Sequence, residues 1–171
     1  MGVWFRVFFI GFLAFGLTGC VLESKKPVFA DGDAKLLLAG YPNLAAYERG
    51  DDGWKKNTDP FSFTAEASHY LVKADTSDMQ VFFVPIDGPW WVLQATETAG
   101  STSYVLVKAE AKELLLYPLD CKTLEESGTF MGQIDFVESD CFIAADADKT
   151  ALFKSLIPAS SEASSKLVSE P

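Results

Sequence analysis

Three cysteines and a single histidine are the residues of this chain best suited to nucleophilic, redox or metal chemistry. The histidine, His69, is accompanied by no GxSxG nucleophile motif, so nothing in the sequence supports a Ser-His-Asp hydrolase. His69 lies at the start of a β-branched, aromatic segment, where we interpret it as a surface or cross-strand residue. The sequence therefore predicts no catalytic residue, and we expect no enzyme activity.

Two short acidic segments alternate carboxylates in a way that calcium sites also do: Asp31-Gly32-Asp33 and Asp146-Ala147-Asp148. Neither segment is followed by the glycine and the bidentate glutamate that a calcium loop requires. Asp146 and Asp148 are better suited to capping a helix N-terminus. The sequence predicts no metal site and no cofactor.

Trp90-Trp91 is the most distinctive local feature of the chain. Successive side chains of a strand point to opposite faces, so one ring is expected to enter the core and the other to face outward or into a cavity. We interpret the pair first as core or half-core residues. The functional alternative is that Trp90 or Trp91 contacts an apolar ligand or a protein partner.

The N-terminus combines one positive charge at Arg6, an apolar run from Val7 to Gly16 and the sequence Leu17-Thr18-Gly19-Cys20. The run is too short to span about 30 Å of hydrocarbon. This arrangement resembles the lipobox signal peptide of bacterial lipoprotein precursors. The resemblance covers residues 1–20 only. An ordinary signal peptide or a short membrane anchor with a coincidental cysteine is the alternative.

The resemblance implies cleavage before Cys20 and acylation of its sulfur. Two or more acyl chains give stable membrane anchoring, whereas one chain binds only marginally. It also implies a location in the cell envelope. In enteric-type sorting, aspartate after the lipidated cysteine means retention in the inner membrane, so Val21 favours the outer membrane, facing the periplasm.

With Cys20 acylated, Cys121 and Cys141 are the two remaining thiols, in an oxidising compartment. We expect them to form a structural disulfide that stabilises the domain by roughly 3 kcal/mol. A redox-active pair is the alternative. It is disfavoured because Asp120 and Asp140 precede the two cysteines, and a neighbouring negative charge lowers the thiolate fraction.

The remainder of the chain is strongly acidic. Removal of residues 1–19 takes away Arg6, which leaves 13 of the 14 basic residues against 24 acidic ones, a net charge of −11. A surface with this charge repels nucleic acid, so nucleic-acid partners are excluded. The partners that remain are the membrane, through the lipid anchor, another envelope protein, or a small apolar ligand.

Composition divides the chain into four parts. Residues 1–19 are the lipoprotein signal peptide, and residues 20–27 are the lipidated cysteine and a short polar tether closed by Pro27. Residues 28–157 are expected to form a single β-rich domain. Residues 158–171 are rich in serine, alanine and glutamate, so we expect a disordered Ser-rich tail.

Turn signals punctuate residues 70–119 at near-regular intervals, and the segments between them are β-branched or aromatic. The run Val81 to Ile86 is apolar at every position, which predicts a strand covered on both faces. Residues 44–49 fit a strand or a helix equally well. Residues 121–141 are expected to be irregular, and Asp146 or Asp148 should cap a helix that buries Leu152, Phe153 and Leu156.

These signals predict a mainly β domain: an antiparallel up-and-down meander that forms a small barrel or curled sheet, with a C-terminal α-helix. The strand spacing is similar to that of lipocalin and calycin-like barrels. We expect the barrel to be filled by its own side chains, among them Phe82, Val84, Leu93, Leu106 and Leu115.

Two functions remain open. The favoured one is a non-enzymatic lipoprotein that acts by contact with another protein, for which a filled interior and an exposed apolar patch would be typical. The alternative is a lipocalin-like lipoprotein that binds a small apolar ligand. A cavity of more than about 300 Å³, lined by Trp, Phe and Leu, would favour it.

Overall fold

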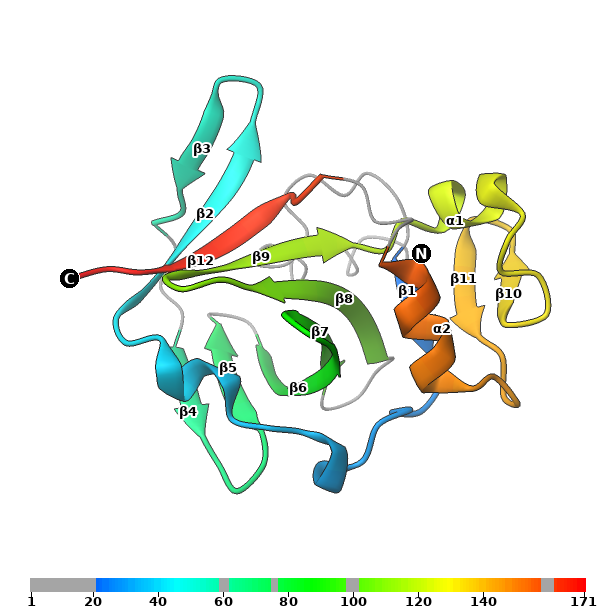
Figure 1. Cartoon of the computed structure of the whole chain (residues 1–171), viewed down its shortest axis with the longest axis horizontal. Coiled ribbons are helices and arrows are strands. Elements are labelled where there is room, and N and C mark those ends of the chain that lie inside the picture. Colours follow the sequence, from blue (N-terminus) through cyan, green and yellow to red (C-terminus); the bar gives the residue numbers. More distant parts are fainter. Residues whose placement is uncertain (1–20, 59–61, 75–76, 98–101, 158–161) are drawn as a thin grey trace, which may run out of the picture.

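A computed structural model describes residues 21–58, 62–74, 77–97, 102–157 and 162–171. About half of the described residues lie in strands (Figure 1). The strands are β1 (Leu22–Ser24), β2 (Leu44–Gly50), β3 (Gly53–Lys56), β4 (Ser62–Ala65), β5 (Tyr70–Ala74), β6 (Ser77–Asp87), β7 (Trp90–Glu97), β8 (Thr102–Ala109), β9 (Glu113–Pro118), β10 (Ile134–Val137), β11 (Asp140–Ile143) and β12 (Ser165–Ser169). The helices are α1 (Cys121–Ser127), α2 (Lys149–Leu156) and the short 3-10 helices η1 (Asp31–Asp33) and η2 (Leu37–Gly40).

The main sheet curls into a half-barrel with the strand order β3-β2-β12-β9-β8-β7-β6-β5-β4. Strands β4 to β9 follow one another in the chain and in the sheet, and each pairs antiparallel with the next. This part is the up-and-down meander that the turn spacing predicts. The fold class is confirmed: mainly β, a curled antiparallel sheet, and a helix after residue 148. Residues 44–49, which left strand and helix open, lie in β2.

Strand β6 shows how the sheet is covered on both faces. Val81 and Phe83 point into the half-barrel, while Phe82 and Val84 point to its outer face, and all four are buried. The inner face forms one apolar cluster, to which every strand from β5 round to β2 contributes. The outer face forms a second cluster beneath α2, β1 and the β10–β11 hairpin. The set expected to fill one interior is therefore divided, since Leu93 belongs to the inner cluster and Phe82 to the outer one.

The outer layer follows from local signals. Asp148 caps α2 by accepting a hydrogen bond from the Ala151 N–H at 3.1 Å, and Leu152, Phe153 and Leu156 are fully buried, as predicted. Asp120 caps α1 in the same way through the Thr123 N–H at 2.9 Å. Residues 121–141 were expected to be irregular, which is wrong: they contain α1 and β10.

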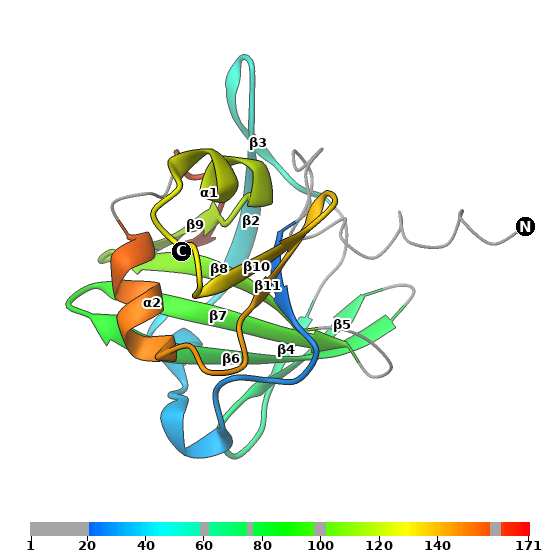
Figure 2. The ribbon, with the colours of Figure 1, turned by 90° about the vertical axis from the view of Figure 1, so that its right-hand side faces the viewer.

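The expected tether at residues 20–27 is wrong over its described part. Leu22 is fully buried, and β1 pairs with β8 on one side and with β11 on the other (Figure 2). The sequence did not predict this strand, because residues 23–26 are polar. A strand of three residues can form with little apolar burial when it pairs with another strand on each side. Figure 2 also shows β1 beside the β10–β11 hairpin.

The expected disordered tail at residues 158–171 is also wrong over its described part, residues 162–171. Residues Ser165–Ser169 form β12, which lies inside the sheet between β2 and β9. Leu167 is 3% exposed and belongs to the inner cluster. A strand flanked on both edges gains two ladders of backbone hydrogen bonds, and these offset a composition poor in apolar residues.

A buried polar network joins the N-terminal segment to the outer face of the sheet. The Ser24 and Tyr104 hydroxyls lie 2.6 Å apart, and the Val28 N–H donates to the Tyr104 oxygen at 3.1 Å. The Gln94 Oε1 accepts from the N–H groups of Val28 and Phe29 at 3.1 and 3.0 Å. Because Gln94 and Tyr104 are fully buried, these hydrogen bonds satisfy groups that water cannot reach.

Candidate functional site

The half-barrel ends at two edge strands, β3 and β4. Strand β4 pairs with β5 on one side, and no described strand pairs with its other edge. An edge strand presents unpaired backbone N–H and C=O groups, which can pair with another chain. The sheet therefore remains open along one line, which we call the seam: the free edge of β4 and the facing start of β2.

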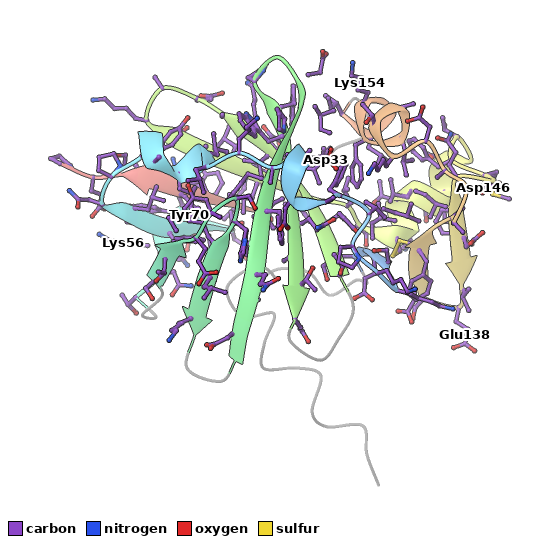
Figure 3. All side chains as sticks on the ribbon, turned by 90° about the horizontal axis from the view of Figure 1, so that it is seen from below. Asp33, Lys56, Tyr70, Glu138, Asp146 and Lys154 are labelled. Carbon is purple, nitrogen blue, oxygen red and sulfur yellow. A yellow bond between two sulfur atoms is a disulfide. The ribbon has the colours of Figure 1, made fainter. Side chains whose placement is uncertain are left out.

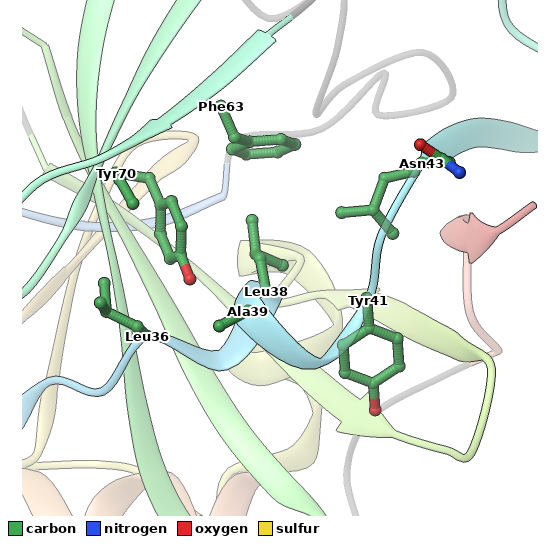
Figure 4. Close-up of a pocket in the computed structure, with 9 residues that line it drawn as sticks. Leu36, Leu38, Ala39, Tyr41, Asn43, Phe63 and Tyr70 are labelled. Carbon is green, nitrogen blue, oxygen red and sulfur yellow. The ribbon is translucent and has the colours of Figure 1, made fainter.

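A pocket of about 290 Å³ lies at the seam (Figure 4). One wall comes from β4 and β5, and the other comes from residues 35–43, which we call the strap, together with the first residue of β2. Its lining consists of Leu36, Leu38, Ala39, Tyr41, Asn43, Leu44, Phe63, Ala65 and Tyr70. This lining contains no carboxylate, histidine, cysteine or cation, so the pocket is suited to binding apolar groups rather than to acid–base or metal chemistry.

Three contacts hold the strap in place. The Lys35 N–H donates to the Phe83 carbonyl of β6 at 2.9 Å, beyond the point where β5 stops pairing with β6. The Tyr41 hydroxyl donates to the Glu110 carbonyl at 2.6 Å. Leu38 inserts into the inner cluster and is 7% exposed. The strap thus closes the mouth of the half-barrel, and Leu36 remains at the surface with 38% exposure.

Aromatic rings form the opposite wall. Phe63 of β4 packs edge-to-face on Tyr70 of β5, with ring centroids 6.1 Å apart, and Tyr70 packs in the same way on Phe83 at 5.9 Å. These pairs follow from the register Phe63↔Val72 and Ala65↔Tyr70, which turns the inner faces of β4 and β5 toward the pocket.

The Tyr70 hydroxyl is a buried polar side-chain group of this wall. Within the described residues it makes no hydrogen bond, although it is buried. Burial raises the pKa of Tyr70, and the nearby backbone of Leu38 and Ala39 opposes that shift. Burial also raises the pKa of Tyr41, with a further contribution from the Glu110 carboxylate. Both phenols are therefore neutral at physiological pH.

Neither Trp90 nor Trp91 lines this pocket. The two rings do lie on opposite faces of β7, as expected: Trp90 packs against the outer cluster and Trp91 against the inner one. The Trp90 ring lies 5.1 Å from that of Tyr117. Both side chains are half-buried, so their contact with a ligand or a partner stays a prediction.

The cysteines separate into a described pair and a residue outside it. The Cys121 and Cys141 sulfurs lie 2.11 Å apart with a Cα–Cα distance of 5.5 Å, the geometry of the expected disulfide, which ties α1 to β11. Cys141 is fully buried and Cys121 is 4% exposed. Cys20, the predicted acylation site, lies outside the described residues.

His69 is more enclosed than a surface position would be. Its side chain is 13% exposed and its ring stacks on Phe82 with a centroid distance of 4.9 Å. Its Nε2 lies 3.4 Å from a Glu66 carboxylate oxygen. Across the residues that the structure covers, no group of three or more His, Cys, Asp or Glu side chains is placed to hold a metal ion.

Among the described helices, none has both the length and the apolar character needed to cross a bilayer. Comparison with known proteins gives no match to a family model, to a curated protein or to a solved structure.

The seam is a site that the sequence reasoning missed. The segments around Phe63 and Tyr70 were recognisable as strands, and a run of three leucines at residues 36–38 signalled an apolar segment. No local signal showed that these segments meet, because 24 residues of sequence separate Leu38 from Ser62 and both belong to the closing edge of a sheet.

Proposed function

We propose that this chain is a lipid-anchored envelope protein whose domain binds an extended segment of another envelope protein at the seam. The observation that carries the proposal is the coincidence of an edge strand with an apolar pocket: among the described strands only β5 pairs with β4, and Phe63 and Tyr70 line a hollow beside that edge. Elsewhere the inner cluster fills the half-barrel.

The geometry suits recognition by strand addition. A partner segment paired with β4 would continue the sheet through main-chain hydrogen bonds, and its alternate side chains would face the pocket. Strand β4 spans Ser62–Ala65 and alternates inner and outer positions, with Phe63 and Ala65 inward and Thr64 outward. The pocket has room for one or two apolar side chains, so it would select the partner residue opposite Phe63.

The location is supported by the N-terminal sequence. Leu17-Thr18-Gly19-Cys20 resembles a lipobox, and Val21 favours the outer membrane, facing the periplasm. The disulfide geometry at Cys121 and Cys141 agrees with an oxidising compartment. A protein tethered to a membrane meets its partners at high effective concentration, so even a short strand pairing can be sufficient for binding.

A second function is favoured by the pocket alone: binding of a small apolar ligand. Its volume of about 290 Å³ lies just below the roughly 300–1,000 Å³ that ligand sites span, which suits only a small ligand. Its walls are aliphatic and aromatic, with the buried Tyr70 hydroxyl adjacent. A ligand here would lie at the mouth of the half-barrel rather than within it.

Site-specific photocrosslinking in cells tests the first function. A photoreactive amino acid replaces Ala65, and the crosslinked partner is digested and sequenced by mass spectrometry. We expect one dominant partner, crosslinked through a single segment of alternating apolar residues. The variant Leu36→Asp, which places a charge in the pocket, should abolish the crosslink.

The matched control is Met131→Asp, because Met131 is also an exposed apolar side chain, 72% accessible, and does not line the pocket. It should leave the crosslink intact. Equal loss in both variants, or crosslinks scattered over many proteins, would exclude strand addition at the seam. Saturable binding of a fluorescent fatty acid to the form beginning at Val21, lost in Leu36→Asp alone, would favour the second function instead.

A further inference from the structure

We infer that the domain rests directly on the bilayer in one fixed orientation, with the tip of the β10–β11 hairpin against the lipid surface. This inference rests on the proposed acylation of Cys20. Its structural basis is that the residues after Cys20 are built into the sheet, so they leave no free tether between the lipid anchor and the folded domain.

Pairing of β1 begins immediately after Cys20. Val21 forms an antiparallel bridge with Asp120, and the Leu22 N–H donates to the Leu119 carbonyl at 2.9 Å. Leu22 is fully buried in the outer cluster. Val21 follows Cys20 directly in the sequence, so no residue stands between the predicted acylation site and the paired segment.

The N-terminal segment is held along its whole length. After β1, the Tyr104 and Gln94 side chains bind Ser24, Val28 and Phe29. Farther along, the Lys149 ammonium donates to the Val28 carbonyl at 2.6 Å. Releasing this segment would break its hydrogen bonds to Gln94 and Tyr104 and would expose the buried side chains of Leu22 and Phe29 to water, which is unfavourable. The segment therefore does not serve as a flexible linker.

Strand register identifies the surface beside the anchor. Strands β1 and β11 run parallel, with Leu22 opposite Cys141. One step back along both strands places Val21 beside Asp140, the first residue after the hairpin turn at Glu138 and Ser139. The start of β1 and the β10–β11 tip lie at the same end of the hairpin in both ribbon views.

The apolar and acidic side chains at the β10–β11 tip indicate which kind of lipid surface this tip contacts. Val137, which pairs with Asp140 at the tip, is 55% exposed, an apolar side chain suited to the headgroup boundary. Glu138 follows Val137 in the chain, Asp140 pairs with it across the hairpin, and Asp120 bridges Val21 at the start of the neighbouring strand, so three carboxylates belong to this end. Carboxylates are repelled by anionic lipids within about a Debye length, so this surface fits zwitterionic phosphatidylethanolamine rather than phosphatidylglycerol.

Quenching by spin-labelled lipids tests the orientation on the full, acylated chain in phosphatidylethanolamine-rich vesicles. A fluorophore is attached at Glu138→Cys, or at Val137→Cys as a second tip variant, and in a separate protein at Lys154→Cys. Figure 3 labels Lys154 at the upper edge and Glu138 at the lower edge of the end of the molecule that carries α2 and the β10–β11 hairpin. A headgroup nitroxide should quench the tip fluorophores several-fold more strongly than the one at position 154.

A linker variant provides the control for rigidity. About ten Gly and Ser residues, preceded by an added Val that keeps Val after Cys20, are inserted before Val21, and their r.m.s. length of roughly 17 Å lets the domain leave the surface. The difference between the two positions should then disappear, although membrane association persists. Equal quenching at both positions in the unmodified, acylated protein would overturn the inference.

Mass spectrometry of the same samples separates the two proposals. Absence of acyl mass on Cys20 would refute the anchoring itself. Acyl mass on Cys20 combined with equal quenching would refute only the fixed orientation.

Discussion

The hydroxyls of Ser24 and Tyr104 lie 2.6 Å apart, although 80 residues separate them in the sequence. Tyr104 is fully buried on β8 and Ser24 is the last residue of β1. Together with Gln94 they attach the N-terminal segment to the sheet. Under the proposed acylation of Cys20, the same contacts that stabilise the fold would also limit how far the domain can move from the lipid.

Replacement of Gln94 by Ala should destabilise the domain by about 3 kcal/mol. The substitution leaves the N–H and the carbonyl of Phe29 without their Gln94 partners in a buried site, while the Val28 N–H keeps the Tyr104 oxygen as acceptor. Each unsatisfied group costs about 1–3 kcal/mol. Urea denaturation followed by tryptophan fluorescence measures the change. Gln80→Ala, at an exposed position on β6, is the matched control and should change the free energy of unfolding by less than about 0.5 kcal/mol. Similar losses in both variants would contradict the role of the network.

The disulfide should contribute roughly 3 kcal/mol to stability, because it closes a loop between residues 20 positions apart. A Cys121→Ala, Cys141→Ala double variant should fold and melt several degrees lower than the parent protein, in non-reducing buffer. Thermal unfolding followed by circular dichroism measures the shift. Two free thiols titrated in protein taken from the envelope would show that the bond does not form there.

Substitution or removal of residues in the C-terminal strand β12 should lower stability, whereas the same changes in a disordered tail would not. Leu167→Ala should destabilise the domain by about 2–4 kcal/mol, because Leu167 is 3% exposed in the inner cluster. Removal of residues 162–171 should leave β2 and β9 unpaired on facing edges and produce an aggregating or unfolded chain. Chemical denaturation and size-exclusion chromatography provide the two readouts. A truncated chain with unchanged stability would refute the placement of β12.

Glu170 should make stability depend on pH in the acid range. Hydrogen bonds from the Lys56 ammonium at 2.7 Å and from the Tyr47 hydroxyl at 2.8 Å lower the pKa of its carboxyl below the ordinary value of 4.5. A carboxyl whose pKa is lowered by folding stabilises the protein above its unfolded pKa, and loses that contribution as the pH falls through the folded pKa. Glu170→Gln should therefore lower the melting temperature at pH 7, and the difference should shrink below pH 4. The control Glu138→Gln, at the hairpin tip, should show no such dependence. A difference that persists at pH 3 would contradict the ion pair as its source.

Local patterns predicted the strands from β5 to β9 and the helix α2 well. In that part of the chain, alternation or continuous apolar runs coincide with turn signals, and each strand pairs with its neighbour in sequence. The cap at Asp148 and the buried stripe at Leu152 and Phe153 required only helix periodicity. The prediction that β6 is covered on both faces is correct, because a continuous run of apolar residues is stable in a strand only when both of its faces are buried.

The pairing of strands that are far apart in the sequence could not be predicted from local patterns. Residues 21–27 and 158–171 were interpreted from composition as tether and tail, since short polar segments in isolation bury too little to fold. In the structure, β1 and β12 are each flanked by two strands distant in sequence. Their hydrogen bonds come from partners that no window of local sequence contains.

The amino-acid sequence by itself determined the strand-forming meander, the helix at its end, the cysteines available for pairing and the acidic surface, because each depends on residue type or on spacing within about a dozen residues. Tertiary structure alone decided that the half-barrel stays open at β4, that Phe63 and Tyr70 face Leu36 across a pocket, and that Val21 is paired one residue after Cys20. These three features arise from strand register and sheet closure, which depend on the sum of many weak contacts between segments far apart in the chain.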